Sequence, residues 1–266
     1  MSWIETRTAF FSARHEGRDT PAARALLRRL ESLRADLAER FDRTPPDVAV
    51  VMHPRSTQLA LAHPWWPLLR LGAAPAARRY LSGFHAAGEI HVLGPRALEA
   101  RASTVPGSRE ALELSPMREY AHLVVAANNP ALPPPFTPAS LVRYLRWAWL
   151  SEGAAAHLSG QTRHLRGAVV RRLREGPPPS FPPSARDAHL LGGSVFGLVE
   201  RVAGPEACVA LASELHPHGP LAALERVCDR PARQIEREWR RHLTAFTRPP
   251  RNVDSLSASI AALSRG

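Results

Sequence analysis

The chain has 266 residues, of which 44% are hydrophobic and 22% are charged. This composition is typical of a folded protein rather than of a disordered or collagen-like one, and the length suits one large domain or two small ones. No run approaches the roughly 18 to 20 apolar residues of a membrane span. The first residues, MSWIETRTAFFSARHE, lack the apolar core and cleavage site of a secretion signal, and Cys208 and Cys228 are too few for a disulfide framework. We therefore expect a cytoplasmic protein without a membrane span.

All the basic residues are arginine, and 35 of them against 24 acidic residues leave a net charge of +11. Such a surplus predicts weak, salt-sensitive attraction to polyanions, because charge acts at a distance. No basic zinc finger, glycine-rich RNA-binding signature or basic-aromatic run accompanies it, so sequence-specific nucleic-acid binding is not indicated. A basic polyanion-binding protein remains one of three candidate functions.

The first half of the chain mixes strands with one long helix. Apolar patterns predict strands at residues 3–14, 48–52 and 88–93. Between the first two, Thr20 is expected to cap an amphipathic helix that runs from Pro21 to about Phe41. The segment 53–86 has no clear period and places Trp65 and Trp66 in an apolar loop.

From Ser108 onward the pattern is mostly helical, with proline-rich interruptions at residues 130–138 and 177–183. Within it, 162–175 predicts a helix with a core-facing apolar stripe and a solvated arginine face. This order predicts an α+β fold with a small twisted N-terminal sheet and a helical C-terminal half. We expect one domain over residues 1–247 and a loosely attached tail over 248–266, with at most one short helix.

The most informative stretch, SPMREYAHLVVAANN, begins at Ser115. Serine followed by proline is a typical helix start, and Arg118 and His122, four residues apart, share one helix face with Glu119 beside them. This is the spacing of the zinc-peptidase motif H-E-x-x-H with arginine in place of the first histidine. That chemistry needs two imidazoles to hold a metal and a carboxylate to take a proton from the metal-bound water.

A second segment, WLSEGAAAHLSG at residues 149–160, resembles the W-L-S-E-G-x-A-x-x-x-S-G segment of gluzincin metallopeptidases, which belong to the thermolysin-like superfamily. The order of the predicted strands and the closing segment QIEREWRRHL at residues 234–243 resemble the same group. The resemblance covers residues 3–246 and implies a zincin-like fold whose helical half carries the altered metal-site helix.

The resemblance also implies a role for each motif residue. Glu119 matches the general base, His122 the second metal histidine and Glu152 the glutamate ligand, whereas Arg118 replaces the first metal histidine. Arginine has no lone pair and stays protonated, so two protein ligands remain where a catalytic zinc site needs three. We expect no resident metal, and we expect Arg118 to form a salt bridge with Glu152, with Glu119 as the less favoured partner.

Three other histidines are candidate replacement ligands. His189 lies where the resembling family often carries a tyrosine that faces the reaction centre, and it is the best substitute. His157 follows Glu152 by five residues and is expected on another helix face, and His91 is expected on an edge strand.

These observations leave three functions. The first is a non-catalytic peptidase-like protein that binds a peptide or protein partner in the former active-site cleft. The second is an active zinc metallopeptidase that uses His122, Glu152 and His189, with Glu119 as general base. The third is the polyanion-binding protein that the net charge favours.

Overall fold

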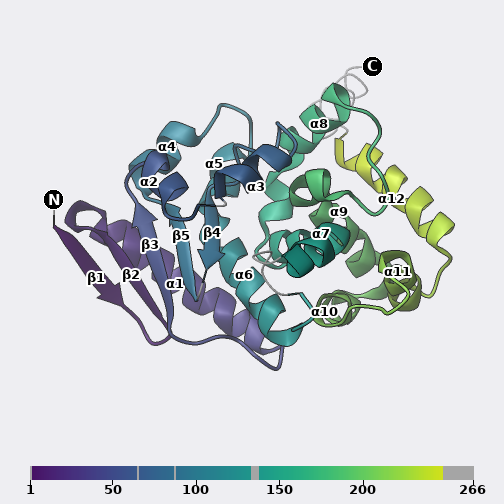
Figure 1. Cartoon of the computed structure of the whole chain (residues 1–266), viewed down its shortest axis with the longest axis horizontal. Helices are drawn as coiled ribbons and strands as arrows, with labels where there is room; N and C mark the ends of the chain where they lie inside the picture. The colour runs from purple at the N-terminus through teal and green to yellow at the C-terminus, as the bar shows by residue number, and fades with distance from the viewer. Residues whose placement is uncertain (1, 65, 87, 133–137, 248–266) are drawn as a thin grey trace, which may run out of the picture.

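The computed structural model describes residues 2–64, 66–86, 88–132 and 138–247. One mixed sheet of five strands lies at the N-terminal end of the molecule (Figure 1). The strands are β1 (Trp3–Arg7), β2 (Phe11–Glu16), β3 (Val48–His53), β4 (Gly83–Ala86) and β5 (Glu89–Leu93). They lie in the order β1-β2-β3-β5-β4; the pairs β2–β3 and β3–β5 are parallel, and β1 and β4 are antiparallel edge strands.

The described chain also contains α-helices. They are α1 (Thr20–Ala38), α2 (Ser56–Leu61), α3 (Trp66–Gly72), α4 (Pro95–Arg101), α5 (Ser108–Glu113), α6 (Ser115–Asn128), α7 (Pro138–Leu158), α8 (Arg166–Glu175), α9 (Ala185–Ala203), α10 (Pro205–Ser213), α11 (Pro220–Cys228) and α12 (Ala232–Thr247). Helices α7 and α9 lie in the middle of the molecule, and α10 to α12 lie at the end away from the sheet (Figure 1). The α+β class is therefore confirmed. None of these helices is long and apolar enough to cross a membrane.

The strand predictions needed two corrections. Residues 3–14 do not form one strand: the chain reverses after Arg7, where the Thr8 amide donates to the Phe11 carbonyl at 2.8 Å, and β1 and β2 pair as a hairpin. The apolar alternation continues through this reversal, so it did not reveal the turn. The strand that carries His91 is not an edge strand either, because β4 lies outside it.

The helix predictions agree with the structure in outline and differ in detail. Trp66 begins α3 instead of lying in a loop, and it packs against Phe84 with ring centroids 5.1 Å apart. Thr20 is the first residue of α1 and not its cap. The basic segment 162–175 divides into a short 3-10 turn (Gln161–His164) and α8. The predicted tail, 248–266, lies outside the described residues.

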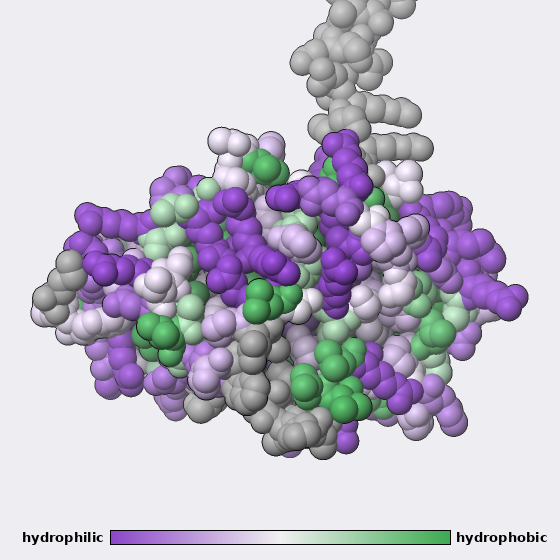
Figure 2. Space-filling view, turned by 45° about the horizontal axis from the view of Figure 1, so that its top comes forward, coloured by the Kyte–Doolittle hydropathy of each residue, from purple (hydrophilic) through white to green (hydrophobic). Residues whose placement is uncertain are grey.

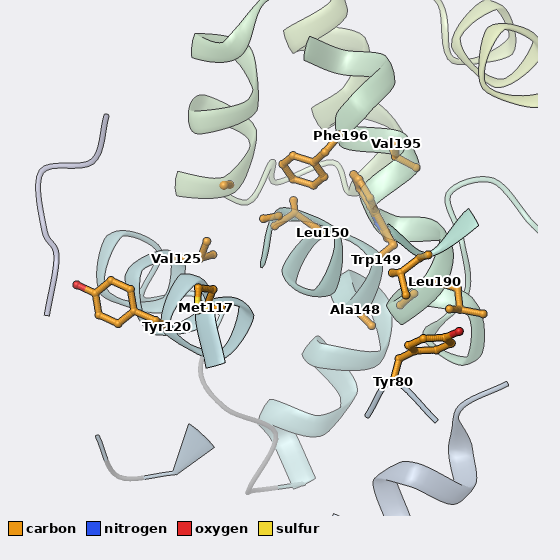
Figure 3. Close-up of a cluster of buried hydrophobic side chains, with 14 of the residues drawn as sticks. Tyr80, Met117, Tyr120, Val125, Ala148, Trp149, Leu150, Leu190, Val195 and Phe196 are labelled. Carbon is orange, nitrogen blue, oxygen red and sulfur yellow. The ribbon is translucent and has the colours of Figure 1, made fainter. Parts of the chain in front are cut away.

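A hydrophobic core runs from the sheet through α6, α7 and α9. Figure 3 shows part of it, where Met117 and Val125 of α6 face the side chains of α7 and α9. Trp149 and Phe196 are fully buried there, with ring centroids 6.4 Å apart. Burying each such side chain contributes roughly 1.5 to 3 kcal/mol, so this core holds the three helices of the candidate site in one arrangement.

Candidate functional site

Helix α6 runs from Ser115 to Asn128, with Pro116 in its first turn, as the sequence predicts. Proline is tolerated there because the first helical amides have no partner within the helix. The motif residues point inward: Arg118, Glu119 and His122 are 2%, 3% and 7% exposed. Charged groups are almost never buried without partners, so the contacts of these side chains define the site.

Helices α7 and α9 approach each other closely at a pair of glycines. A Cβ atom on Gly192 would lie 2.6 Å from the Trp149 carbonyl oxygen and 2.9 Å from the backbone of Gly153. Only glycine permits this approach, because any side chain would overlap the facing backbone. Glu152 precedes Gly153 and His189 lies one turn before Gly192, so the crossing brings these two side chains together.

The guanidinium of Arg118 lies in a chain of charged and polar groups. One Arg118 Nη atom contacts Glu152 Oε2, and the other lies 3.4 Å from Glu119 Oε1. The second oxygen of each carboxylate is also bonded: Tyr144 donates its hydroxyl to Glu152 at 2.7 Å, and His85 Nδ1 lies 2.8 Å from Glu119. The expected Arg118–Glu152 salt bridge is therefore present, with the more distant Glu119 as the second partner.

Two further histidines face the same carboxylate. His122 Nε2 lies 3.7 Å and His189 Nδ1 lies 3.5 Å from Glu152 Oε2. Burial, and then the positive charge of Arg118, hold the pKa of His122 and the pKa of His189 well below the ordinary value of 6.5. Both rings are therefore neutral at pH 7, and neither nitrogen of His189 has a hydrogen-bond partner among the described residues.

Burial also shifts the remaining ionisable groups of the cluster. It raises the pKa of Tyr144 to about 12, against the opposing effect of Arg118, so the phenol stays protonated and acts as a donor to Glu152. Burial lowers the pKa of Arg118, while the negative charge of Glu119 raises it. A guanidinium remains charged at neutral pH under such a shift, so Arg118 supplies the positive charge that the two carboxylates require.

The arrangement does not fit a zinc ion. His122, Glu152 and His189 approach one another, but the guanidinium contacts the very oxygen of Glu152 that a metal would need. Over residues 2–64, 66–86, 88–132 and 138–247, no three His, Cys, Asp or Glu side chains are placed so that they could hold a metal ion. A catalytic zinc needs three such ligands at about 2.0 to 2.2 Å, and a cation beside it would repel it.

The other two histidines lie elsewhere. His157 is on a different face of α7, where its Nε2 atom lies 3.6 Å from Glu200 of α9. His91 lies on β5 beside His53, with 3.1 Å between their ring nitrogens. Neither contributes to the cluster around Glu152.

Sequence reasoning missed two members of this cluster. Tyr144 lies eight residues before Glu152, about two helical turns, so helical spacing places both on one side of α7. That spacing could have revealed it. His85 lies on β4, a four-residue strand in a segment without clear periodicity, and no pattern marked it.

With the geometry established, comparison with known proteins adds no identification: no protein-family model, no curated protein and no solved structure matches this chain.

Proposed function

We propose that this chain is a non-catalytic peptidase-like protein, related to the gluzincins, that binds an extended peptide segment of a partner beside its former active site. One observation carries the loss of catalysis. The guanidinium of Arg118, at the position of the first metal histidine, is buried in contact with Glu152, the matched metal ligand.

The same contacts remove the general base from use. Glu119 would have to accept a proton from an activated water, but one of its oxygens faces His85 at 2.8 Å and the other faces Arg118 at 3.4 Å. Both carboxylate oxygens of Glu119 are therefore occupied by contacts within the protein. Without a metal, no water of lowered pKa is supplied to it.

Binding of a peptide is supported by the edge of the sheet. Strand β4 ends the strand order and pairs only with β5 among the described strands. Helix α6 packs against β4, and His85 of β4 contacts Glu119 of α6. An edge strand can accept an extended peptide as an additional strand, with main-chain hydrogen bonds providing affinity. A peptide added to β4 would lie next to the altered site.

The convergence of His122 and His189 on Glu152 favours a second candidate, an active zinc enzyme with Glu119 as general base. The distances of 3.7 and 3.5 Å to Glu152 Oε2 are compatible with shared coordination only if Arg118 withdraws. Withdrawal would place its charge elsewhere in a buried region, which opposes this candidate.

Metal content tests the two candidates directly. We expect elemental analysis of the untagged protein to find well under one zinc per chain, and we expect no cleavage of general peptide substrates. The variant R118H should bind about one zinc by calorimetry, because it completes three protein ligands. The double variant R118H/H122A is the matched control and should lose that zinc. About one zinc in the original protein, lost on H122A, would contradict the proposal and establish the second candidate.

Peptide binding needs its own measurement. A peptide selected from a random library should shift the amide NMR signals of residues 83–86 and of the start of α6. Shifts confined to other parts of the molecule would contradict binding at the β4 edge.

A further inference from the structure

A separate hollow with a volume of 870 Å³ lies between the start of α2, the segment that follows α3, helix α4 and helix α8. Figure 2 turns the upper edge of Figure 1 toward the viewer and shows hydrophilic residues gathered across the middle of this face. The lining includes Arg55, Arg70, Arg78, Arg79, Arg96 and Arg101, and Arg171 of α8 closes the far side. No Asp or Glu is among the described lining residues. The hollow shares no residue with the site around Glu152.

Arg101 is one of these lining arginines, and backbone carbonyl oxygens hold its side chain in place. Its guanidinium donates to the carbonyls of Arg79, Arg78 and Leu81 at 2.5, 2.6 and 3.1 Å. Carbonyls orient the group without neutralising it. Burial, followed by the charges of Arg70 and Arg79, lowers the pKa of Arg101 to about 10. The fold therefore holds like charges together at a cost in stability.

Three other lining arginines also lack a negative partner. The Nε atom of Arg70 is buried without a hydrogen-bond partner among the described residues. Burial and the charge of Arg78 lower the pKa of Arg70. Arg55 and Arg96 are exposed, and neither forms an ion pair with a described residue. The buried, unpartnered Nε atom of Arg70 and the surplus of positive charge around one hollow indicate that an anion completes it.

We propose that this hollow is a binding site for a small ligand that carries at least two linked phosphate groups. Guanidinium forks bind phosphate oxygens in pairs, which explains a lining of arginines. One phosphate carries at most about two negative charges, too few for the six lining arginines other than Arg171, which pairs with Glu175. The volume lies in the roughly 300 to 1,000 Å³ range of small-ligand sites, whereas a nucleic acid strand requires an extended groove.

Calorimetry with inorganic tripolyphosphate and, separately, with ATP tests the site. The measurements use the full chain at about 0.15 M ionic strength, where exposed charges are screened beyond about 8 Å. We expect one bound molecule per chain. The variant R55Q/R96Q should weaken binding about tenfold or more, because charge-assisted bonds to phosphate are lost. The control R24Q/R28Q removes two exposed arginines of α1 and should leave the affinity unchanged.

Each outcome decides the proposal. Weaker phosphate binding in R55Q/R96Q with unchanged binding in the control supports the site. Tighter binding of ATP than of tripolyphosphate by the original protein then assigns part of the affinity to the nucleoside. Equal weakening in both variants shows general charge attraction only and overturns it. No binding of either probe, or several molecules per chain, also overturns it. Because the hollow and the Glu152 site share no residue, these results are independent of the zinc measurements.

Discussion

Arg118 and Glu152 form an ion pair in which the guanidinium is buried and the carboxylate is partly buried, and neighbouring polar groups offset part of the cost of burying the two charges. Removing two charged groups from water costs several kcal/mol per ion, and their attraction together with further hydrogen bonds offsets that cost. Tyr144 provides one such bond to Glu152, and Glu119 provides a second negative charge beside the guanidinium. Removing this positive charge would leave the buried Glu119 and the partly buried Glu152 with only the contacts of His85 and Tyr144.

We expect R118M to lower the free energy of unfolding by about 3 to 5 kcal/mol, because methionine fills the space but leaves Glu119 and Glu152 unpaired. Urea unfolding followed by circular dichroism measures the change. The double variant R118M/E152M should recover part of the loss, since it removes one of the two stranded carboxylates.

The exposed pair of Arg171 and Glu175, 2.7 Å apart and one helical turn away from each other, offers a control. R171M should cost no more than about 0.5 kcal/mol. A loss in R118M as small as that in R171M would show that Arg118 is not part of a buried charge network.

Among the elements, the crossing of α7 and α9 determines where the candidate site forms. Gly153 and Gly192 allow the two backbones to come into contact, and Glu152 and His189 lie immediately beside this point. A larger separation of these two helices would move the Glu152 carboxylate away from His189. The site therefore depends on two residues that carry no functional group.

The variant G192A tests this dependence. Its methyl group would overlap the backbone of α7, so we expect a loss of about 1 to 3 kcal/mol in the free energy of unfolding despite alanine's better helix propensity. G72A is a suitable control, because a Cβ atom there meets nothing within 4 Å. An unchanged stability in G192A would mean that the helices can separate without penalty.

Across the whole molecule, several histidines are kept neutral by burial. Burial, and then the nearby His91, lower the pKa of His53 to about 4, and burial lowers the pKa of His91 as well. The pKa values of His122 and His189 are shifted in the same direction. These residues lie both in the sheet and in the helical half, so protonation opposes folding in both regions.

The consequence is a loss of stability in mild acid. A histidine with a folded pKa below its unfolded value of about 6.5 takes up its proton first in the unfolded state, so the free energy of unfolding falls as pH decreases from about 6.5 toward about 4. We expect urea unfolding to show clearly lower stability at about pH 5 than at about pH 7.5. At about pH 7.5 these histidines are neutral in both states, so they no longer make the free energy of unfolding depend on pH.

The variant H53Q should reduce that dependence, because one of the titrating groups is removed. Equal stability of the original protein at both pH values would contradict the assignment of neutral buried histidines.

Local patterns were sufficient for much of this protein. The SPMREYAHLVVAANN stretch predicted the start of α6. Its spacing placed Arg118, Glu119 and His122 on one side of that helix, because helical periodicity is a property of the chain itself. The short buried strand near Val48 was found for the same reason. Composition alone indicated an excess of arginine without indicating where it gathers.

What remained depended on contacts between segments distant along the chain. Three features join residues from separate elements. They are the contact of His85 with Glu119, the position of β4 outside β5 and the gathering of seven arginines around one hollow. No local period encodes such contacts, since they follow from how helices and strands pack. The sequence by itself determined which residues are candidates for the site, and the tertiary structure decided their partners. The packing of α6 against α7 places the Arg118 guanidinium against Glu152, and the close approach of α7 and α9 brings His189 to the same carboxylate, because both contacts join helices that are separate along the chain.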